Sequence, residues 1–278
     1  MTMQVVFFGS SEFSVIVLEK VLSAKCQVLS VVTTPDKPMG RHLKLTPNPV
    51  KAFAQAHNIS VYTSPLSFPS PIIGEGAGGE VLGVVVAYGQ ILKQEVIDAF
   101  NGQIYNIHPS LLPKYRGPSP LQQQILDGLT ETGVTIIKLD SEVDHGPIVA
   151  QEKSQIIPTD TTVTLGVKLF SLGANLFLKL LNNSPLPFPS LSQREGPEVS
   201  YTKKLTRQDG FLEFEEFNNY LKIDNWKLKI DRLWRAYYPW PGIWTTTPEG
   251  KRLKLIALQP QISVQLESKT PQSWPIVL

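Results

Sequence analysis

Short, almost continuous apolar runs alternate with amphipathic stretches along the first two thirds of the chain. The runs Gln4–Phe8, Val28–Thr33 and Val81–Ala87 lack the polar–apolar alternation of a half-exposed strand, so we expect strands buried on both faces of a sheet. Between the first two runs, Glu12–Ser23 has apolar residues at helical spacing behind a serine cap. A strand, a helix and a strand in this order predict a parallel β-α-β unit with a right-handed crossover.

The same alternation continues further along the chain. We expect further strands at Gly133–Leu139 and Ile148–Ile157, and helices at Gln90–Ala99, Ser119–Leu126 and Thr162–Leu181. The pattern indicates an α/β protein with an open, mostly parallel sheet. The first strand is not followed by a G-x-G-x-x-G turn, which argues against a dinucleotide-binding fold of the dehydrogenase type.

Two proline-rich segments interrupt this pattern. Residues 64–80 and 182–200 have no hydrophobic period, and their similar starts (SPLSFPS and SPLPFPS) lack the further copies that a solenoid requires. We interpret residues 64–80 as a surface insert and residues 182–200 as a linker. We therefore expect a first domain over residues 1–181 and a second over residues 201–278.

The second domain is expected to be rich in short strands. Apolar runs at Ile243–Thr247, Leu253–Leu258 and Ile262–Leu266 are separated by turn residues, which is typical of a small barrel. Residues 224–235 are compatible with a helix. The basic and aromatic residues of RAYYPWP, residues 235–241, suit an RNA-facing surface, although Trp and Tyr in a small β domain are more often part of the core.

Composition narrows the class of protein. With 278 residues, 42% hydrophobic and 18% charged, the chain can form a proper core. A net charge of +2 does not require a nucleic-acid partner, so any RNA contact must come from local basic patches. One cysteine excludes an internal disulfide, and with only four histidines we expect no metal site. We see no secretion signal and no apolar run of transmembrane length, so we expect a cytoplasmic protein without a membrane contact.

Candidate chemistry gathers in Ile104–Pro120, IYNIHPSLLPKYRGPSP. A short strand presents Asn106 and His108 on one face, and four prolines then exclude a helix. An amide beside an imidazole suits acyl transfer, because Asn can donate to a developing oxyanion and His can donate to it or move a proton near neutral pH. Asp144, in a tight turn before Gly146, would orient His108 and accept a proton from an attacking amine. Taken singly, each of these features is more often ordinary turn chemistry.

Two further segments are candidates for ligand binding. The turn Ala87–Leu92 follows the most apolar strand, and ligands of open α/β sheets bind beyond the carboxyl ends of strands, so its backbone would suit a flat heterocycle. A plain strand-to-helix turn is equally compatible. Thr34–Pro49 has four prolines, so we expect a loop. Its cations Lys37, Arg41 and Lys44 suit either a solvated surface or an arm that grips phosphate.

The central motif resembles a known family. Asn106-x-His108, the SLLP run at residues 110–113 and Gly117, followed by Asp144 before a glycine, resemble the 10-formyltetrahydrofolate-dependent formyltransferases. That family includes branches that act on methionyl-tRNA, on glycinamide ribonucleotide and on sugar nucleotides. Four segments resemble the methionyl-tRNA branch: FFGSSEFSV, TTPDKPMGRHLKLTPNPVK, SYTKKLTRQDG and RAYYPWPGIWT. The ribonucleotide branch is a single shorter domain and would lack the last two.

The resemblance implies a fold and a reaction. The fold is a Rossmann-like open, mostly parallel sheet followed by a β-barrel-like domain of the OB type, shorter here than is usual in the family. The reaction is transfer of the formyl group of 10-formyltetrahydrofolate to the α-amine of methionyl-initiator tRNA, by a monomer and without a metal. Two alternatives stay open: a sugar-nucleotide N-formyltransferase, and a folate- or RNA-binding protein without turnover.

The resemblance also implies which residues form the site. In the family the basic loop enters the acceptor arm of the initiator tRNA, a role that falls by position to Arg41, with Lys37 and Lys44 nearby. The Asn-x-His pair would stabilise the tetrahedral oxyanion, and Asp144 would hold the imidazole. The expected folate pocket consists of residues from the two turns: Ala87, Tyr88, Gly89, Ile91, Leu92, Ser110, Leu111, Leu112 and Pro113.

Overall fold

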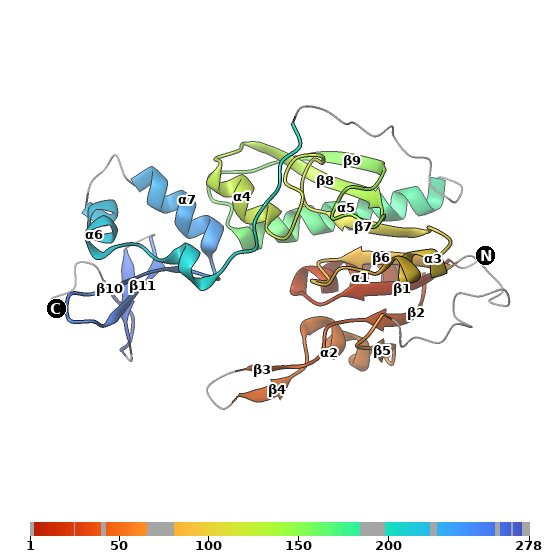
Figure 1. Ribbon diagram of the computed structural model, residues 1–278, viewed down its shortest axis with the longest axis horizontal. Coiled ribbons are helices and arrows are strands. Elements are labelled where there is room, and N and C mark those ends of the chain that lie inside the picture. Colours follow the sequence, from red (N-terminus) through yellow and green to blue (C-terminus); the bar gives the residue numbers. More distant parts are fainter. Residues whose placement is uncertain are drawn as a thin grey trace. The chain divides into compact units, whose positions relative to one another are not determined.

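The computed structural model divides into two compact units (Figure 1). Unit 1 comprises residues 1–117, 132–154 and 166–201, and unit 2 comprises residues 118–131, 155–165 and 202–278. The structure describes residues 3–24, 26–39, 43–65, 81–183, 198–222, 227–258, 262–267 and 269–273. Nearly all of the expected insert at 64–80 lies outside these residues, and the sequence-based domain boundaries stay a prediction.

Unit 1 is built on a seven-stranded sheet with the order β5-β2-β1-β6-β7-β8-β9. Neighbours from β5 to β7 are parallel, whereas β8 runs antiparallel to β7. The strand order changes direction between β1 and β6, so a topological switch point lies at their carboxyl ends. This confirms the expected open, mostly parallel sheet. The strands are β1 (Gln4–Gly9), β2 (Gln27–Val32), β5 (Ser60–Tyr62), β6 (Val81–Val86), β7 (Ile104–His108), β8 (Glu131–Lys138) and β9 (Ile148–Gln155).

Helices bury the central strands. α1 (Glu12–Ser23) begins at a capping box formed by Ser11 and packs against β1, β2 and β6. α2 (Pro49–Ala56) packs against α1, and α3 (Gln94–Ala99) contributes Val96 and Ile97 to the core cluster that contains Val6 and Phe8 of β1. All residues of β6 are buried, as the continuous apolar run predicts.

α5 (Thr162–Asn183) corrects one expectation. It spans 22 residues and reaches a mean hydropathy of 1.4, so by length and composition alone it is apolar enough to cross a membrane. The expectation that no run reaches this length is therefore wrong. A core helix has the same composition, and α5 packs as one does: Phe170 stacks on Phe13, and a side chain at Gly173 would collide with Ile107 and Val134 of the sheet.

The segment Thr34–Pro49 is not the loop that its prolines suggest. It contains an antiparallel ribbon of β3 (Lys37–Met39) and β4 (Lys44–Thr46), in which Pro38 pairs with Leu45. Both strands of a two-stranded ribbon are edges, so a residue without an N–H is tolerated there. The ribbon projects from the rest of unit 1 (Figure 1).

Unit 2 contains the four-stranded antiparallel sheet β10-β11-β12-β13, which confirms the expected β-rich C-terminal part. Residues 118–131 and 155–165 group with it through direct contacts. α4 packs against α7, and Arg235 Nη1 donates to Asp160 O at 3.0 Å. The elements are α4 (Pro120–Leu126), α6 (Phe214–Lys222), α7 (Lys227–Tyr237), β10 (Ile243–Thr246), β11 (Arg252–Ala257), β12 (Ser263–Leu266) and β13 (Gln272–Ser273). α6 and β13 were not expected from the sequence.

A charged cap starts the 3-10 turn Arg207–Gly210 of unit 2. Asp209 accepts hydrogen bonds from the Thr206 amide at 2.6 Å and from the Thr206 hydroxyl at 2.8 Å, and it pairs with Lys203. The bond from Lys203, together with those from Thr206, lowers the pKa of Asp209 to about 2. The carboxylate form is therefore the one that caps this turn.

Candidate active site

The carboxyl end of β7 brings Asn106 and His108 to the turn that carries Asp144. Asn106 Nδ2 donates to Asp144 Oδ1 at 3.1 Å, and His108 Nδ1 lies 3.5 Å from the same oxygen. The other carboxylate oxygen, Oδ2, accepts the Gly117 N–H at 2.8 Å. The structure thus brings together the amide, the imidazole and the carboxylate that the sequence singled out.

Local backbone geometry places Asp144. Its φ is +50°, in the left-handed region that Asp tolerates better than most residues. Two residues later, a side chain at Gly146 would collide with the carbonyl oxygen of Lys138. Lys138 N also donates to Pro147 O at 2.9 Å, which closes the turn. The turn therefore requires its glycine and is anchored at both ends to β8.

His108 is held at both ring nitrogens. The residue is only 4% exposed, and Nε2 lies 2.9 Å from the carbonyl oxygen of Tyr115. A carbonyl can only accept, so Nε2 carries a proton and Nδ1 is the nitrogen that faces Asp144. The carbonyl belongs to a residue with a φ of +62°, an uncommon conformation for Tyr.

Polar side chains of two strands form hydrogen bonds with the backbone of the loop after His108. Thr135 Oγ1 donates to Ser110 O at 2.6 Å and accepts the Leu112 N–H at 3.1 Å. Gln151 Nε2 donates to Leu112 O at 2.8 Å. Thr135 on β8 and Gln151 on β9 were not singled out from the sequence, where each is one polar residue in an unremarkable strand.

The turn after β6 is open. α3 begins at Gln94, so the expectation of a helix from Gln90 is wrong, and residues 87–93 form an irregular connection. Gly89 has a φ of +81°, and among the described residues, apart from its two chain neighbours, no atom lies within 4 Å of the place where a side chain would start. The neighbouring Ile91 is 75% exposed. Open space beside an exposed apolar side chain suits a flat aromatic ligand.

The residues of the expected folate pocket differ in how exposed they are to a ligand. Ala87, Gly89 and Ile91 are exposed, and Leu111 and Pro113 are half-buried. The remaining four are buried, which leaves them little surface for a ligand: Tyr88, Leu92, Ser110 and Leu112. Burial also raises the pKa of the Tyr88 hydroxyl.

The hydroxyl of Ser10 joins this turn to the base of the β3–β4 ribbon. Ser10 Oγ donates to Tyr88 O at 3.0 Å and accepts the Thr34 N–H at 3.1 Å. Asn48, at the other end of the ribbon, donates through Nδ2 to Thr34 O at 2.8 Å. Lys37 and Lys44 of the ribbon are exposed, whereas Arg41 lies outside the described residues.

The described residues contain no group of three or more His, Cys, Asp and Glu side chains that could hold a metal ion. The amide, imidazole and carboxylate of this site are the kinds of group that acyl transfer to an amine uses.

Comparison with known proteins agrees with this geometry. Residues 3–181 match the family model "Formyl transferase", and residues 221–273 match "Formyl transferase, C-terminal domain". The methionyl-tRNA formyltransferase of Roseiflexus castenholzii is 38% identical over 259 residues, which cover 92% of this chain and 80% of that protein. The enzyme of the same name from Kosmotoga olearia is 36% identical over 260 residues, which cover 91% and 78%.

Solved structures show the same fold. A phosphoribosylglycinamide formyltransferase from Bacillus halodurans aligns with a TM-score of 0.52 at 26% identity, over 66% of this chain and 98% of that one. An N-formyltransferase from Helicobacter canadensis, in complex with folinic acid and dTDP-3-aminofucose, aligns with a TM-score of 0.62 over 96% of both chains. Its identity is only 19%, so this second likeness concerns the fold alone.

Proposed function

This chain belongs to the formyl transferase family, and on that basis we propose that it transfers the formyl group of 10-formyltetrahydrofolate to the α-amine of methionyl-initiator tRNA. The product, N-formylmethionyl-tRNA, serves translation initiation. Relatives named methionyl-tRNA formyltransferase, which match about nine tenths of the chain, support this substrate. The structural observation that carries the proposal is the convergence of Asn106 and His108 on Asp144.

Asn106 is assigned to the developing oxyanion. When the amine adds to the formyl carbon, the carbonyl oxygen becomes negative. One N–H of Asn106 is already given to Asp144 at 3.1 Å, which fixes the amide and leaves its second N–H for this oxygen. A fixed donor of this kind contributes about 3 kcal/mol to the transition state.

His108 acts through Nδ1. Because Nε2 donates to Tyr115 O, the ring has only Nδ1 left for the reaction, and this nitrogen faces Asp144 at 3.5 Å. A protonated ring therefore donates Nδ1–H either to the carboxylate or to the formyl oxygen. The ring and the carboxylate can share one proton during the reaction.

Asp144 is assigned to the proton that passes from the amine to the folate during the transfer. A bond forms between the amine nitrogen and the formyl carbon, and the bond from that carbon to N10 of the folate breaks. The amine loses a proton, and N10 gains one as it leaves. The Asp144 side chain is 13% exposed and already bound by Asn106 and Gly117, so it is positioned to hold this proton between the two steps.

The segments beside the site suit the two substrates. We assign the ring system of the folate to the open turn at residues 87–93, against the exposed side chain of Ile91 and the free space at Gly89. We assign tRNA phosphates to the projecting β3–β4 ribbon, where Lys37 and Lys44 are exposed, and to Arg41 by its position in the sequence. The protein is proposed to act as a cytoplasmic monomer.

Formylation of radiolabelled methionyl-initiator tRNA by the purified protein and 10-formyltetrahydrofolate tests the proposal. We expect Asn106→Ala to lower kcat by about 10²- to 10³-fold, because the oxyanion loses a fixed donor. Asn175→Ala is a matched control, since that amide is exposed on the surface, where it accepts a bond from Lys20. Transfer to a nucleotide-linked amino sugar but not to tRNA would favour the sugar branch. An Asn106→Ala protein with the parental rate would refute the assignment of the site.

A further inference from the structure

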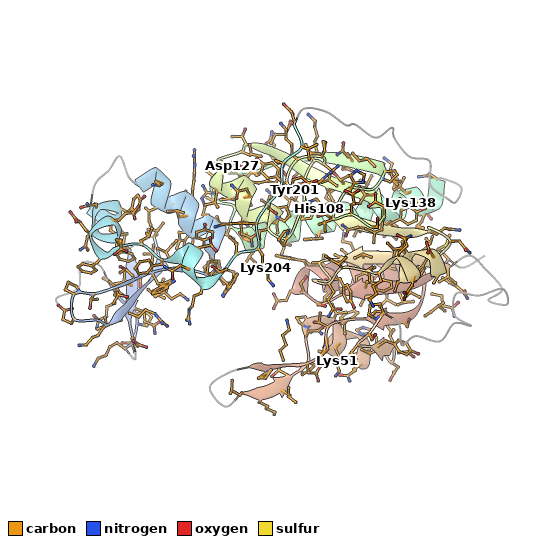
Figure 2. All side chains as sticks on the ribbon, in the orientation of Figure 1. Lys51, His108, Asp127, Lys138, Tyr201 and Lys204 are labelled. Carbon is orange, nitrogen blue, oxygen red and sulfur yellow. The ribbon has the colours of Figure 1, made fainter. Side chains whose placement is uncertain are left out.

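The segment at the end of the expected linker lies against the active-site loop. This return segment, residues 198–201, makes a short parallel β-bridge to residues 113–116 through Tyr201 and Arg116. Arg116 N donates to Ser200 O at 2.9 Å, and Arg116 Nη1 donates to the Tyr201 hydroxyl at 3.1 Å. Figure 2 labels His108 and Tyr201 in this part of unit 1. The two segments lie far apart in the sequence but form one structure beside the site.

Within the return segment, Ser200 is connected to His108 through the backbone of Tyr115. Its Oγ accepts the backbone N–H of Tyr115 at 2.9 Å. The carbonyl of the same residue, Tyr115, accepts from His108 Nε2 at 2.9 Å. Tyr115 has a φ of +62°, which costs a non-glycine residue free energy, so its conformation depends on the groups that hold it.

We propose that Ser200 is a positioning residue for formyl transfer. Its hydroxyl holds Tyr115 in the left-handed conformation, and the Tyr115 carbonyl then keeps the proton of His108 on Nε2 and turns Nδ1 towards Asp144. In a neutral imidazole the partner of one nitrogen decides which nitrogen carries the proton. The effect on turnover rests on the proposed function, but the effect on the ring does not.

The hydroxyl of Ser200 can be separated from the other contacts of the return segment. The bond from Arg116 N goes to a backbone carbonyl and remains when the hydroxyl is removed. The ion pair of Lys114 with Glu198 also remains, and both of its side chains are largely exposed, so it contributes little. Ser200→Ala therefore removes this hydrogen bond to the Tyr115 amide while it leaves the segment attached.

The test combines a spectroscopic and a kinetic measurement. In proton–nitrogen NMR spectra of the imidazole groups, with His108→Ala for assignment, we expect the parent to show His108 with its proton on Nε2. In Ser200→Ala we expect averaged signals of the two tautomers. We expect kcat for formylation to fall about ten-fold, with the KM values of both substrates within about two-fold, because binding groups are untouched. Ser200→Thr restores the hydroxyl and should restore both properties.

Glu198→Gln serves as the matched control, since it breaks the exposed ion pair with Lys114 and should change neither the ring signals nor kcat. Parental ring signals and a parental kcat in a folded Ser200→Ala protein would overturn the proposal. So would a loss of kcat that Ser200→Thr does not restore. If the parent protein does not formylate methionyl-tRNA but the ring signals respond as expected, the proposed function fails and the positioning role stands.

Discussion

The carboxylate of Asp144 is the group whose removal tests the site most directly. In Asp144→Asn the side chain keeps its shape but loses its charge and one acceptor. Its oxygens accept from Asn106 at 3.1 Å and from Gly117 at 2.8 Å, so an amide can satisfy only one of these donors. The other donor must move or face an NH₂ group. Since the backbone of Gly117 is the less adjustable of the two, we expect the amide of Asn106 to reorient.

The magnitude follows from the distance between His108 and Asp144. The Coulomb energy between an imidazolium and a carboxylate 3.5 Å apart is about 5 kcal/mol at an effective dielectric constant of about 20. The two side chains are 5% and 13% exposed, so solvent screens this pair only partly. Loss of this stabilisation when the ring becomes protonated corresponds to a fall in kcat of about 10³-fold.

The assay is steady-state formylation of methionyl-initiator tRNA, with each substrate varied up to saturation. Binding groups are unchanged, so the KM values should stay within about three-fold. Asp140→Asn is the matched control, because Asp140 also pairs with a histidine, His145 at 2.8 Å, but has no contact with Asn106 or His108 among the hydrogen bonds of the described residues. An Asp144→Asn enzyme with more than a tenth of the parental kcat would refute the electrostatic reasoning, and so would an equal loss in the Asp140 variant.

Thr135→Val leaves the buried Leu112 N–H without its acceptor, so thermal or urea unfolding should show a loss of about 2 kcal/mol, with lower kcat. Lys44→Ala should raise the KM for tRNA and lower the slope of log KM against log salt by about 1, while the KM for folate stays constant. Asp209→Ala removes a cap worth about 1 kcal/mol. The pKa of Asp209 is lowered from about 4 in the unfolded chain to about 2 in the folded protein. The parent should therefore exceed the variant in unfolding free energy by the whole amount above about pH 4, and this difference should disappear as the pH falls through about 2.

The residues that sequence analysis located are those whose geometry is set locally. Strand alternation alone places Asn106 and His108 on one face, and the glycine two positions after Asp144 indicates a tight turn. The fold class follows equally from apolar runs such as β1 and β6, which are buried as predicted. The wrong expectation of a loop at residues 34–49 also has a local cause. Its prolines argue against a central strand, but both strands of the β3–β4 ribbon are edge strands, which tolerate proline.

The residues that hold the active-site loop in place could not be predicted from local sequence patterns. Thr135, Gln151 and Ser200 are single polar residues in a strand, a second strand and the expected linker, and none has a neighbour in sequence that indicates its partner. Each contacts the loop after His108 at a residue that lies between 23 and 85 positions away along the chain. Their roles depend on which strands pair and in which register, and an apolar pattern with a period of two does not specify the partner strand.

The register of β7 with β8 shows how much depends on that information. β8 is antiparallel to β7, and His108 is paired with Thr135. This pairing places the Thr135 hydroxyl next to the loop that follows His108, where it donates to Ser110 O and accepts from Leu112 N. A slip of one residue would bring Val134 or Ile136 to this position, and neither can form a side-chain hydrogen bond. β8 therefore contributes to the candidate site in two ways. Through Thr135 it supports the loop whose Tyr115 carbonyl lies 2.9 Å from His108, and its end at Lys138 leads into the turn that carries Asp144.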